Sequence, residues 1–390
     1  MRLFPGSVAA LALVAVTGLV GGAAVTPATA ASPARALDSV TLVGSGYGHG
    51  KGMSQYGAKV AAERGSTAAQ ILSFYYPGTA AGRSGGSIAV LLTAATSNNV
   101  VVQHKAGLKV RSAQTGKVWK LGKKGAKRWR LTPVGTTKTR LSVKTKGWHV
   151  VRDIPGQAEF KGGAIRLYVP GGSAVYRGKL RSAVAGAGSA RDTVNIVSVE
   201  QYLRGVVAAE MPASWSRAAV QAQAVAARTY AIFDRDTTNR GHFDVWDTTR
   251  SQVYRGVAGE HPLSDAAIKA TAGQIRTYGG KPAFTQFSSS NGGYTVAGSS
   301  TQPYLKAQPD DYDPKTQWTQ TISAATLKKV FPGIGEIESV TVTKRDGKGS
   351  WGGRALKVTV DGTKGVPVTV DGDDFRSWLG LRSTLFQVRS

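Results

Sequence analysis

The sequence contains no cysteine at all, which excludes disulfide bonds, thiolate metal sites and cysteine nucleophiles. Acidic residues are scarce as well: 23 Asp and Glu stand against 50 Lys and Arg, giving a formal charge of +27. Between Glu63 and Asp153 there is no acidic residue, and the basic ones are densest at 120–130. A charge field of this sign attracts nucleic acid, anionic lipid or anionic wall polymers, unless it serves solubility alone.

The first thirty residues have the pattern of a secretory signal peptide. Arg2 precedes an apolar stretch at 8–25, and the small residues at 28–30 form a cleavage triplet. We therefore expect residues 1–30 to be removed and the protein to be secreted, with a retained N-terminal anchor as the alternative. No second apolar run of about 20 residues follows, so no transmembrane segment is expected in the mature protein. Export makes nucleic acid the least favoured polyanion.

The rest of the chain predicts an α+β fold, in which antiparallel β-sheet units surround a helical centre. Residues 31–82 contain a linker, a glycine-rich loop around His49 and helices at 55–63 and 67–75. Residues 83–190 form a basic β-rich region, with short strands such as 88–92, 108–112, 141–143, 165–169 and 194–197. Residues 191–320 form the core, and residues 321–390 form a last unit with strands at 339–343, 356–360 and 366–370 and a helix at 373–379.

The helical centre is the clearest part of this pattern. Ser198, with Gln201 three residues later, predicts a capping box and a helix that continues to position 209. An alanine-rich second helix is expected at 215–233 and a third at 263–271, because alanine has the highest helix propensity and permits close packing.

Glu210 is the outstanding carboxylate of this sequence. Its neighbours are apolar, namely Val206, Val207, Ala208, Ala209, Met211, Pro212 and Trp215. Partial desolvation should raise the pKa of the carboxyl, and an acid still protonated near neutrality can serve as a general acid. The alternative is an ion pair at a helix end with Arg204 or Arg228.

Several long motifs resemble the SpoIID/LytB family. They are VEQYLRGVVAAEMPASWSRAAVQAQAVAARTYAI at 199–232, GYGHGKGMSQYGA at 46–58, DTTRSQVYRG at 247–256, FSSSNGG at 287–293 and PYLKAQPDDYD at 303–313. Sporulation members of the family carry the histidine motif near their C-terminus, whereas here it comes first. Five separate motifs make the resemblance specific, and it covers most of the mature chain outside the basic β-rich region.

The resemblance implies a peptidoglycan protein of bacteria, with sporulation members that are lytic transglycosylases acting on glycan stripped of its peptides. Glu210 matches the family's catalytic glutamate. In this chemistry one residue protonates the oxygen between N-acetylmuramic acid and N-acetylglucosamine and then helps the C6 hydroxyl attack C1. Ordinary hydrolysis needs a second carboxylate about 5 to 9.5 Å away, and Asp234, Asp236, Asp244 and Asp247 keep that option open.

The resemblance also implies the residues that bind glycan. Arg228 matches a groove arginine that could hold the lactyl carboxylate of muramic acid, unless it forms a salt bridge with Glu210 or Glu200. Gln221 stands where sporulation members have a groove lysine, which weakens the case for full activity. The other expected contacts are Gln223, Tyr230, Gln252, Tyr254, His49, Ser54, Gln55, Tyr56, Ser288, Ser289 and Ser290. For His49 a surface position in a tight glycine loop is the alternative.

No metal or other cofactor is expected. Some sporulation members bind zinc through one histidine and two cysteines, but the cysteine positions here are Trp246 and Ser251. His242 alone cannot form a tetrahedral site.

A second function from another class stays open. The chain could be a non-catalytic wall-binding protein that enhances an N-acetylmuramoyl-L-alanine amidase, as one branch of the family is thought to do. Glu210 favours the enzyme and Gln221 favours the binder. Either function implies peptidoglycan glycan strands and anionic wall polymers as partners.

Overall fold

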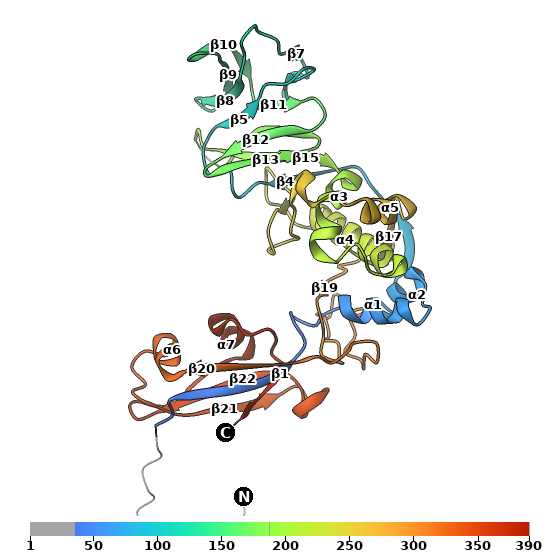
Figure 1. Cartoon of the computed structure of the whole chain (residues 1–390), viewed down its shortest axis with the longest axis vertical. Helices are drawn as coiled ribbons and strands as arrows, with labels where there is room; N and C mark the ends of the chain where they lie inside the picture. The colour runs from blue at the N-terminus through green and yellow to red at the C-terminus, as the bar shows by residue number, and fades with distance from the viewer. Residues whose placement is uncertain (1–35, 187, 390) are drawn as a thin grey trace, which may run out of the picture.

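The computed structural model describes residues 36–186 and 188–389, so the predicted signal peptide lies outside the described residues. The chain is elongated, with a β-rich region at one end, helices in the middle and a second β unit at the other end (Figure 1). Within the described residues no helix has the length and apolar character needed to cross a membrane.

The predicted α+β class is confirmed, because antiparallel sheets flank a group of packed helices. The α-helices are α1 (Gln55–Glu63), α2 (Ala68–Tyr75), α3 (Val199–Glu210), α4 (Arg217–Thr237), α5 (Pro262–Ala270), α6 (Ala324–Val330) and α7 (Gly372–Leu379). Six of them match expected helices within a few residues. Helix α6 was not expected, and it is a two-turn helix capped by the Ser323 hydroxyl.

The basic β-rich region at 83–190 belongs to two sheets, the second of which also contains strands at 191–198 and 245–246 from the expected core. The first has the order β10-β9-β8-β5-β12-β13, with the bounds Trp148–Pro155, Lys138–Lys144, Arg128–Val134, Val100–Gln103, Ile165–Val169 and Gly172–Tyr176. The second has the order β16-β4-β15-β14-β11-β6-β7, with the bounds Val245–Trp246, Ser87–Leu91, Arg191–Ser198, Lys179–Val184, Ala158–Lys161, Lys109–Ser112 and Val118–Lys120. Alternating apolar residues such as Leu141 and Val143 are fully buried, so the basic side chains occupy the outer faces.

The helical centre begins where β15 ends. Ser198 caps α3 by accepting a hydrogen bond from the Gln201 amide at 3.3 Å. Alanines of α4, among them Ala222, Ala226 and Ala227, are fully buried, and this helix packs against α1, α2, α3 and α5. Short strands complete the centre: β3 (Ala80–Arg83), β17 (Gln274–Tyr278), β18 (Lys281–Pro282), β2 (Met53–Ser54) and β19 (Phe287–Ser288).

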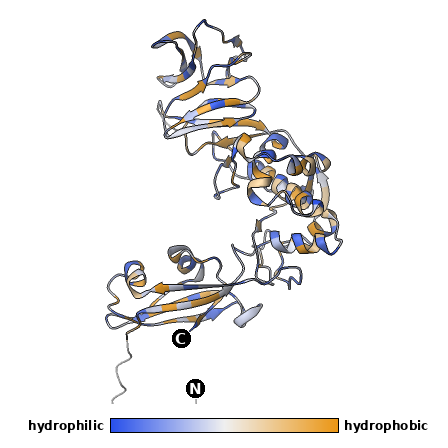
Figure 2. Cartoon of the chain, viewed as in Figure 1, coloured by the Kyte–Doolittle hydropathy of each residue, from blue (hydrophilic) through white to orange (hydrophobic). Residues whose placement is uncertain are grey.

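The C-terminal unit has its own hydrophobic core, and the N-terminal strand β1 (Ser39–Ser45) belongs to it. β1 pairs with β20 (Gln317–Ser323) and β24 (Phe386–Arg389), while β21 (Ile337–Arg345), β22 (Ala355–Gly362) and β23 (Val368–Asp371) form a second sheet. Apolar and polar residues alternate along these strands (Figure 2), and Val40 and Leu42 point inward. We did not expect this strand, because its long-range pairing partners are not visible in local sequence.

Because β1 belongs to the C-terminal unit and α1 to the helical centre, the glycine-rich loop at 46–52 runs between them. This placement carries His49 to the boundary between the two cores.

Candidate functional site

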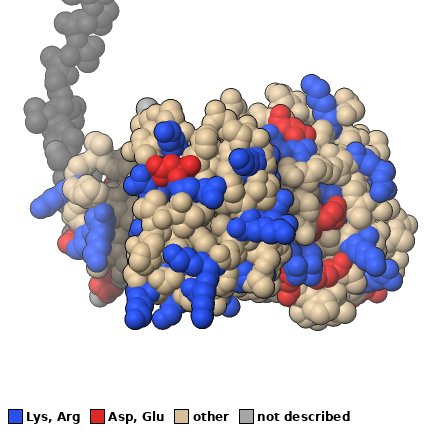
Figure 3. All heavy atoms as spheres, turned by 90° about the horizontal axis from the view of Figure 1, so that it is seen from above, with Lys and Arg blue, Asp and Glu red and all other residues tan. Residues whose placement is uncertain are grey.

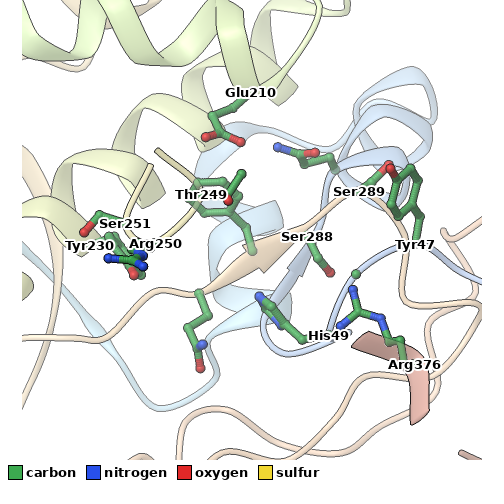
Figure 4. A pocket seen from close by; sticks show the side chains of 14 residues that line it. Tyr47, His49, Glu210, Tyr230, Thr249, Arg250, Ser251, Ser288, Ser289 and Arg376 are labelled. Atoms are coloured by element: carbon green, nitrogen blue, oxygen red, sulfur yellow. The ribbon is translucent and has the colours of Figure 1, made fainter. Parts of the chain in front are cut away.

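A cleft of about 590 Å³ lies where the helical centre meets the C-terminal unit. Figure 4 shows Glu210 on one side of it and His49 and Arg376 on the other. The lining residues are Tyr47, Gly48, His49, Gln55, Glu210, Tyr230, Thr249, Arg250, Ser251, Gln286, Phe287, Ser288, Ser289 and Arg376. The cleft thus combines polar side chains with aromatic rings, a lining that suits a sugar chain.

Glu210 is the last residue of α3, and the backbone N–H of Val253 donates a hydrogen bond to its Oε1 at 2.9 Å. Burial raises the pKa of the Glu210 carboxyl, although the Val253 hydrogen bond and the charge of Arg255 act against that shift. The negative end of the α3 dipole also disfavours ionisation. The carboxyl is therefore held in one orientation, and burial favours its protonated form more than water would.

The alternative for Glu210, an ion pair with Arg204 or Arg228, does not form. Arg204 donates to Asp265 and also pairs with Glu260. Glu210 keeps the surroundings of a general acid.

The glycine-rich loop brings His49 to the cleft by packing against the serine loop at 287–293. β2 pairs in parallel with β19, so the segment at 46–58 meets the segment at 287–293 in space. Gly52 has φ +65°, and a Cβ there would lie 2.1 Å from the carbonyl oxygen of Gln286. Glycine is required because a side chain would push the two loops apart.

His49 lines the cleft and is at the same time exposed, so the surface position that was its alternative is also found. Desolvation, together with the positive charges of Lys51, Arg376 and Arg354, lowers the pKa of its imidazole from 6.5 to about 4. Its Nδ1 accepts a hydrogen bond from the Lys51 amide at 3.0 Å. The proton of the neutral ring therefore sits on Nε2, which makes that nitrogen a donor.

Serines of the two loops divide into two groups. Ser288 and Ser289 line the cleft. Ser290 and Ser54 are buried, and both hydroxyls donate to the carboxylate of Asp313, at 2.9 and 2.7 Å. The second pair does not reach the cleft and instead holds the two loops together.

Arg228 requires a correction. Its side chain is fully buried, and its Nε and Nη2 donate to the two carboxylate oxygens of Glu200 at 2.8 and 2.9 Å. The salt bridge with Glu200, which was the alternative, is the one that the structure shows. Arg228 cannot hold a substrate carboxylate, because α4 carries it into the interior between α3, α5 and β17.

The structure does not bring several other expected contacts to the cleft either. Gln252 and Tyr254 are buried, where Gln252 accepts from the Tyr202 hydroxyl and Tyr254 donates to Asn195. Gln223 is also buried, and its Oε1 accepts from Gln55 Nε2 at 3.3 Å, so it supports the lining residue Gln55 from behind. Gln221 is half-buried and does not line the cleft.

The other two expected tyrosines differ in position. Tyr230 lines the cleft and stacks on Phe284 with ring centroids 5.1 Å apart. Tyr56 is 43% exposed and rests against Trp215 beside the cleft, with centroids 5.0 Å apart.

Apart from Gly48, which has no side chain, sequence reasoning did not name seven of the lining residues as cleft contacts: Tyr47, Thr249, Arg250, Ser251, Gln286, Phe287 and Arg376. Five of these lie inside the quoted motifs, and Gln286 directly precedes one, so reading whole motifs would have found them. Arg376 lies outside all of them, and only the docking of α7 brings it to the cleft.

The aspartates that kept a second carboxylate open do not line the cleft. Asp234 pairs with Arg240 and Asp236 with Arg235, while Asp244 and Asp247 accept hydrogen bonds from the Ala89 and Thr93 amides. Among the described lining residues, Glu210 is the sole carboxylate.

The residues that the resemblance placed at zinc-ligand positions have other partners. His242 Nε2 lies 2.7 Å from an Asp192 oxygen, and the Ser251 hydroxyl donates to Asp234 at 3.1 Å. The ring of Trp246 lies beneath the Arg250 guanidinium. In residues 36–186 and 188–389 no group of three or more His, Asp or Glu side chains could hold a metal ion.

Comparisons with known proteins each match a part of the chain. Residues 187–278 match the family model SpoIID, described as Stage II sporulation protein. The chain is 45% identical over 129 residues to the Amidase enhancer of Bacillus subtilis (strain 168), covering 32% of this chain and 17% of that protein. It is 32% identical over 222 residues to the Stage II sporulation protein D of the same strain, covering 51% and 62%. The chain thus spans less than two thirds of either relative.

Proposed function

Because the chain belongs to the SpoIID/LytB family through residues 187–278, which makes it a cell-wall-related protein, we propose that it is a peptidoglycan lytic transglycosylase. The observation that carries the proposal is the solitary carboxylate of the cleft. Glu210 has a raised pKa, and no second carboxylate is present among the described lining residues. Retaining and inverting hydrolysis both need two carboxyl groups across the bond, whereas internal attack by a sugar hydroxyl needs one.

The proposed reaction uses Glu210 twice. The protonated carboxyl gives its proton to the glycosidic oxygen as the bond from that oxygen to C1 of N-acetylmuramic acid breaks. The resulting carboxylate then takes the proton of the C6 hydroxyl as its oxygen bonds to C1, which leaves a 1,6-anhydro end. Glu210 is protonated again when the step is complete. The Val253 N–H fixes the carboxyl for both transfers.

Other lining residues provide contacts for the sugar chain. Neutral His49 offers an Nε2–H donor, and Ser288, Ser289 and Gln55 offer polar atoms to hydroxyl and acetamido groups. Tyr230 supplies an aromatic face or edge.

The outer surface of the β-rich region suits a wall anchor for a secreted protein. Figure 3 views the molecule from this end and shows Lys and Arg spread across the face, with fewer Asp and Glu among them. The guanidinium of Arg130 lies 4.3 Å from the ring centroid of Trp148, and that of Arg152 lies 5.1 Å from Trp119. These paired cations and rings are suited to anionic wall polymers and sugars.

The test is mass spectrometry of muropeptides released from purified sacculi, both intact and stripped of peptides by an amidase. We expect the wild type to release anhydromuramyl ends and Glu210→Gln to lose about 10²- to 10⁴-fold in rate, because the amide cannot supply a proton. Comparable release by Glu210→Gln would show that another residue is the acid.

A non-catalytic amidase enhancer is the second candidate, favoured by the 45% identity to a protein of that name and by Gln221 in place of a lysine. An N-acetylmuramoyl-L-alanine amidase would then be the partner. Suppose that neither the wild type nor Glu210→Gln releases anhydromuramyl ends, even from glycan stripped of peptides. If both proteins still bind walls and stimulate an added amidase, the enhancer function holds.

A further inference from the structure

The outer face of the second, seven-stranded sheet of the β-rich region carries a row of lysines. Four neighbouring strands, β14, β11, β6 and β7, place lysines directly opposite one another: Lys179, Lys161, Lys109 and Lys120. Phe160, the residue before Lys161, is fully buried, so the lysines occupy the opposite, outer face. Adjacent strands lie about 4.8 Å apart, so the row extends about 14 Å across the strands.

The lysine row does not serve the stability of the sheet. Like charges directly opposite one another on neighbouring strands destabilise a sheet. Lysines can protect an edge strand from pairing with another chain, but of these four strands only β7 lies at an edge. Lys109, Lys120 and Lys161 form no ion pair with any residue at 36–186 or 188–389. A row that costs stability and has no partner within the fold indicates an anionic partner from outside.

The neighbouring row of the same face is organised by one buried carboxylate. Glu159 of β11 is fully buried and lies opposite Arg111 of β6 on one side and Arg181 of β14 on the other. Both arginines and Lys179 pair with it, at 2.8, 2.8 and 3.0 Å, and all three cations stay partly exposed. One carboxylate among three cations leaves a net positive charge. Glu159 thus fixes these cations beside the lysine row without neutralising them.

A hollow of about 450 Å³ adjoins the β14 end of the lysine row. Its lining includes Lys161, Lys179 and the glycines of two turns, and none of its described lining residues is Asp or Glu. The third cation of the lining, Arg177, donates to both carboxylate oxygens of Glu260, so its charge is already compensated. Lys161 is therefore a lining cation with its charge available to a ligand.

The shape and charge of this face fit a linear polyanion better than a lipid bilayer. A surface that binds bilayers presents apolar side chains that enter the lipid, whereas the row consists of lysines. A chain that lies across the strands meets one cation on each strand. A polymer of phosphodiesters and polyols carries a negative charge in every repeat of its main chain, while a glycan strand carries its charges on side groups.

We propose that the lysine row and the hollow beside it bind one phosphodiester chain of a cell-wall polymer, which lies across the strands. This site rests on the proposed function in taking the cell wall as its setting, and it gives the anchor a defined position and ligand class. The β-rich region and the cleft of Glu210 lie on opposite sides of the helical centre (Figure 1), so both can be occupied at once.

The test compares two double variants of the whole protein that lose the same charge. Lys109→Gln with Lys161→Gln removes two lysines of the row and breaks no ion pair of the described residues. Lys138→Gln with Lys146→Gln is the control, because both lysines are exposed and belong to β9 and the turn after it. Soluble polyglycerol phosphate is the probe, with affinity measured at several salt concentrations.

The row variant should bind polyglycerol phosphate about ten- to thirtyfold more weakly than the wild type, and the control should stay within about threefold. The slope of log affinity against log salt concentration should fall by up to about one for each row lysine removed. The urea midpoint of the row variant should be unchanged or higher, because the substitutions remove a repulsion between opposite strands. Weaker binding would then not come from a loss of the fold.

Purified walls distinguish the source of the anion. Walls treated with hydrofluoric acid, which cleaves phosphodiesters, should bind the wild type and the row variant alike.

Three outcomes overturn the inference. The first is an equal loss of affinity in the row variant and the control, which would assign binding to diffuse charge. The second is tighter binding of the wild type than of the row variant to acid-treated walls, which would assign the row to peptidoglycan. The third is a loss of binding to phosphatidylglycerol vesicles in the row variant with polyglycerol phosphate binding unchanged, which would assign the row to a bilayer. Absence of anhydro ends from the wild type would sink the proposed catalysis alone, because these measurements involve no turnover.

Discussion

Arg228 of α4 and Glu200 of α3 form a two-pronged ion pair, in which the arginine is completely buried and the glutamate remains 37% exposed. The guanidinium also donates to the carbonyl oxygens of Gln274 at 3.1 Å and Ile268 at 3.3 Å. One side chain thereby joins α3, α4, α5 and β17. These helices position Glu210, so Arg228 acts on the site through the scaffold.

Arg228→Ala should destabilise the fold by about 3 to 5 kcal/mol, because it leaves a cavity and removes the partner of Glu200. Chemical denaturation measures this change. Arg217→Ala provides the control, since Arg217 is exposed on the same helix and should cost less than about 0.5 kcal/mol. Equal effects of the two substitutions would contradict the structural role.

Glu210→Gln should stabilise the protein at neutral pH. Burial raises the pKa of Glu210 in the folded state, so above the unfolded value of 4.5 the folded protein binds more protons than the unfolded one. The free energy of unfolding therefore falls as pH rises from that value through the folded pKa. Urea titrations of the wild type and the variant at pH 4 and pH 7.5 measure the free energy of unfolding. The variant should be more stable than the wild type at pH 7.5, and the difference should shrink at pH 4. A difference independent of pH would refute the raised pKa.

Gly52→Ala should disrupt the contact between the glycine and serine loops. The added methyl would meet the Gln286 carbonyl at 2.1 Å and would also carry the cost of a positive φ, about 1 to 2 kcal/mol. Gly65→Ala is the matched control, because Gly65 has φ +88° but nothing within 4 Å of its added methyl. The difference between their unfolding free energies isolates the clash. We expect Gly52→Ala to lose more stability and glycan binding, and equal losses would count against the close packing.

Binding to purified walls should weaken as salt rises. Exposed charges are screened over about 8 Å at physiological ionic strength and over about 3 Å at 1 M. Co-sedimentation with walls at increasing sodium chloride concentration tests this expectation. If the fraction of protein retained on the walls does not change with salt concentration, an electrostatic anchor is ruled out. Replacing exposed basic residues at 120–130 should reproduce the effect of salt.

Chelators should leave activity intact. The resemblance implies zinc-binding cysteines at two positions that are occupied here by Trp246 and Ser251. Neither side chain is a ligand that zinc favours in proteins. Activity before and after treatment with a chelator, together with elemental analysis of the protein, tests this expectation. Zinc present in a one-to-one ratio and lost along with activity would disprove it.

Local sequence determined the secondary structure of the helical centre and the partly desolvated surroundings of Glu210. Helix caps, alanine content and apolar neighbours act over a few residues, so Ser198, the α4 alanines and the raised pKa of Glu210 could be predicted. The motifs also placed His49, Gln55, Ser288 and Ser289 among the candidates that line the cleft.

Tertiary structure alone decided which side of a helix faces the cleft and which distant segments meet there. Arg228 and Gln223 sit on the same helix as Tyr230, yet packing turns the first two inward and leaves the tyrosine in the cleft. Strand β1 pairs with β20, whose partner residues are some 280 positions away, and that pairing delivers the His49 loop to the boundary of two cores. Arg376 enters the cleft for the same reason. Burial and long-range pairing depend on the whole chain, and no local pattern encodes them.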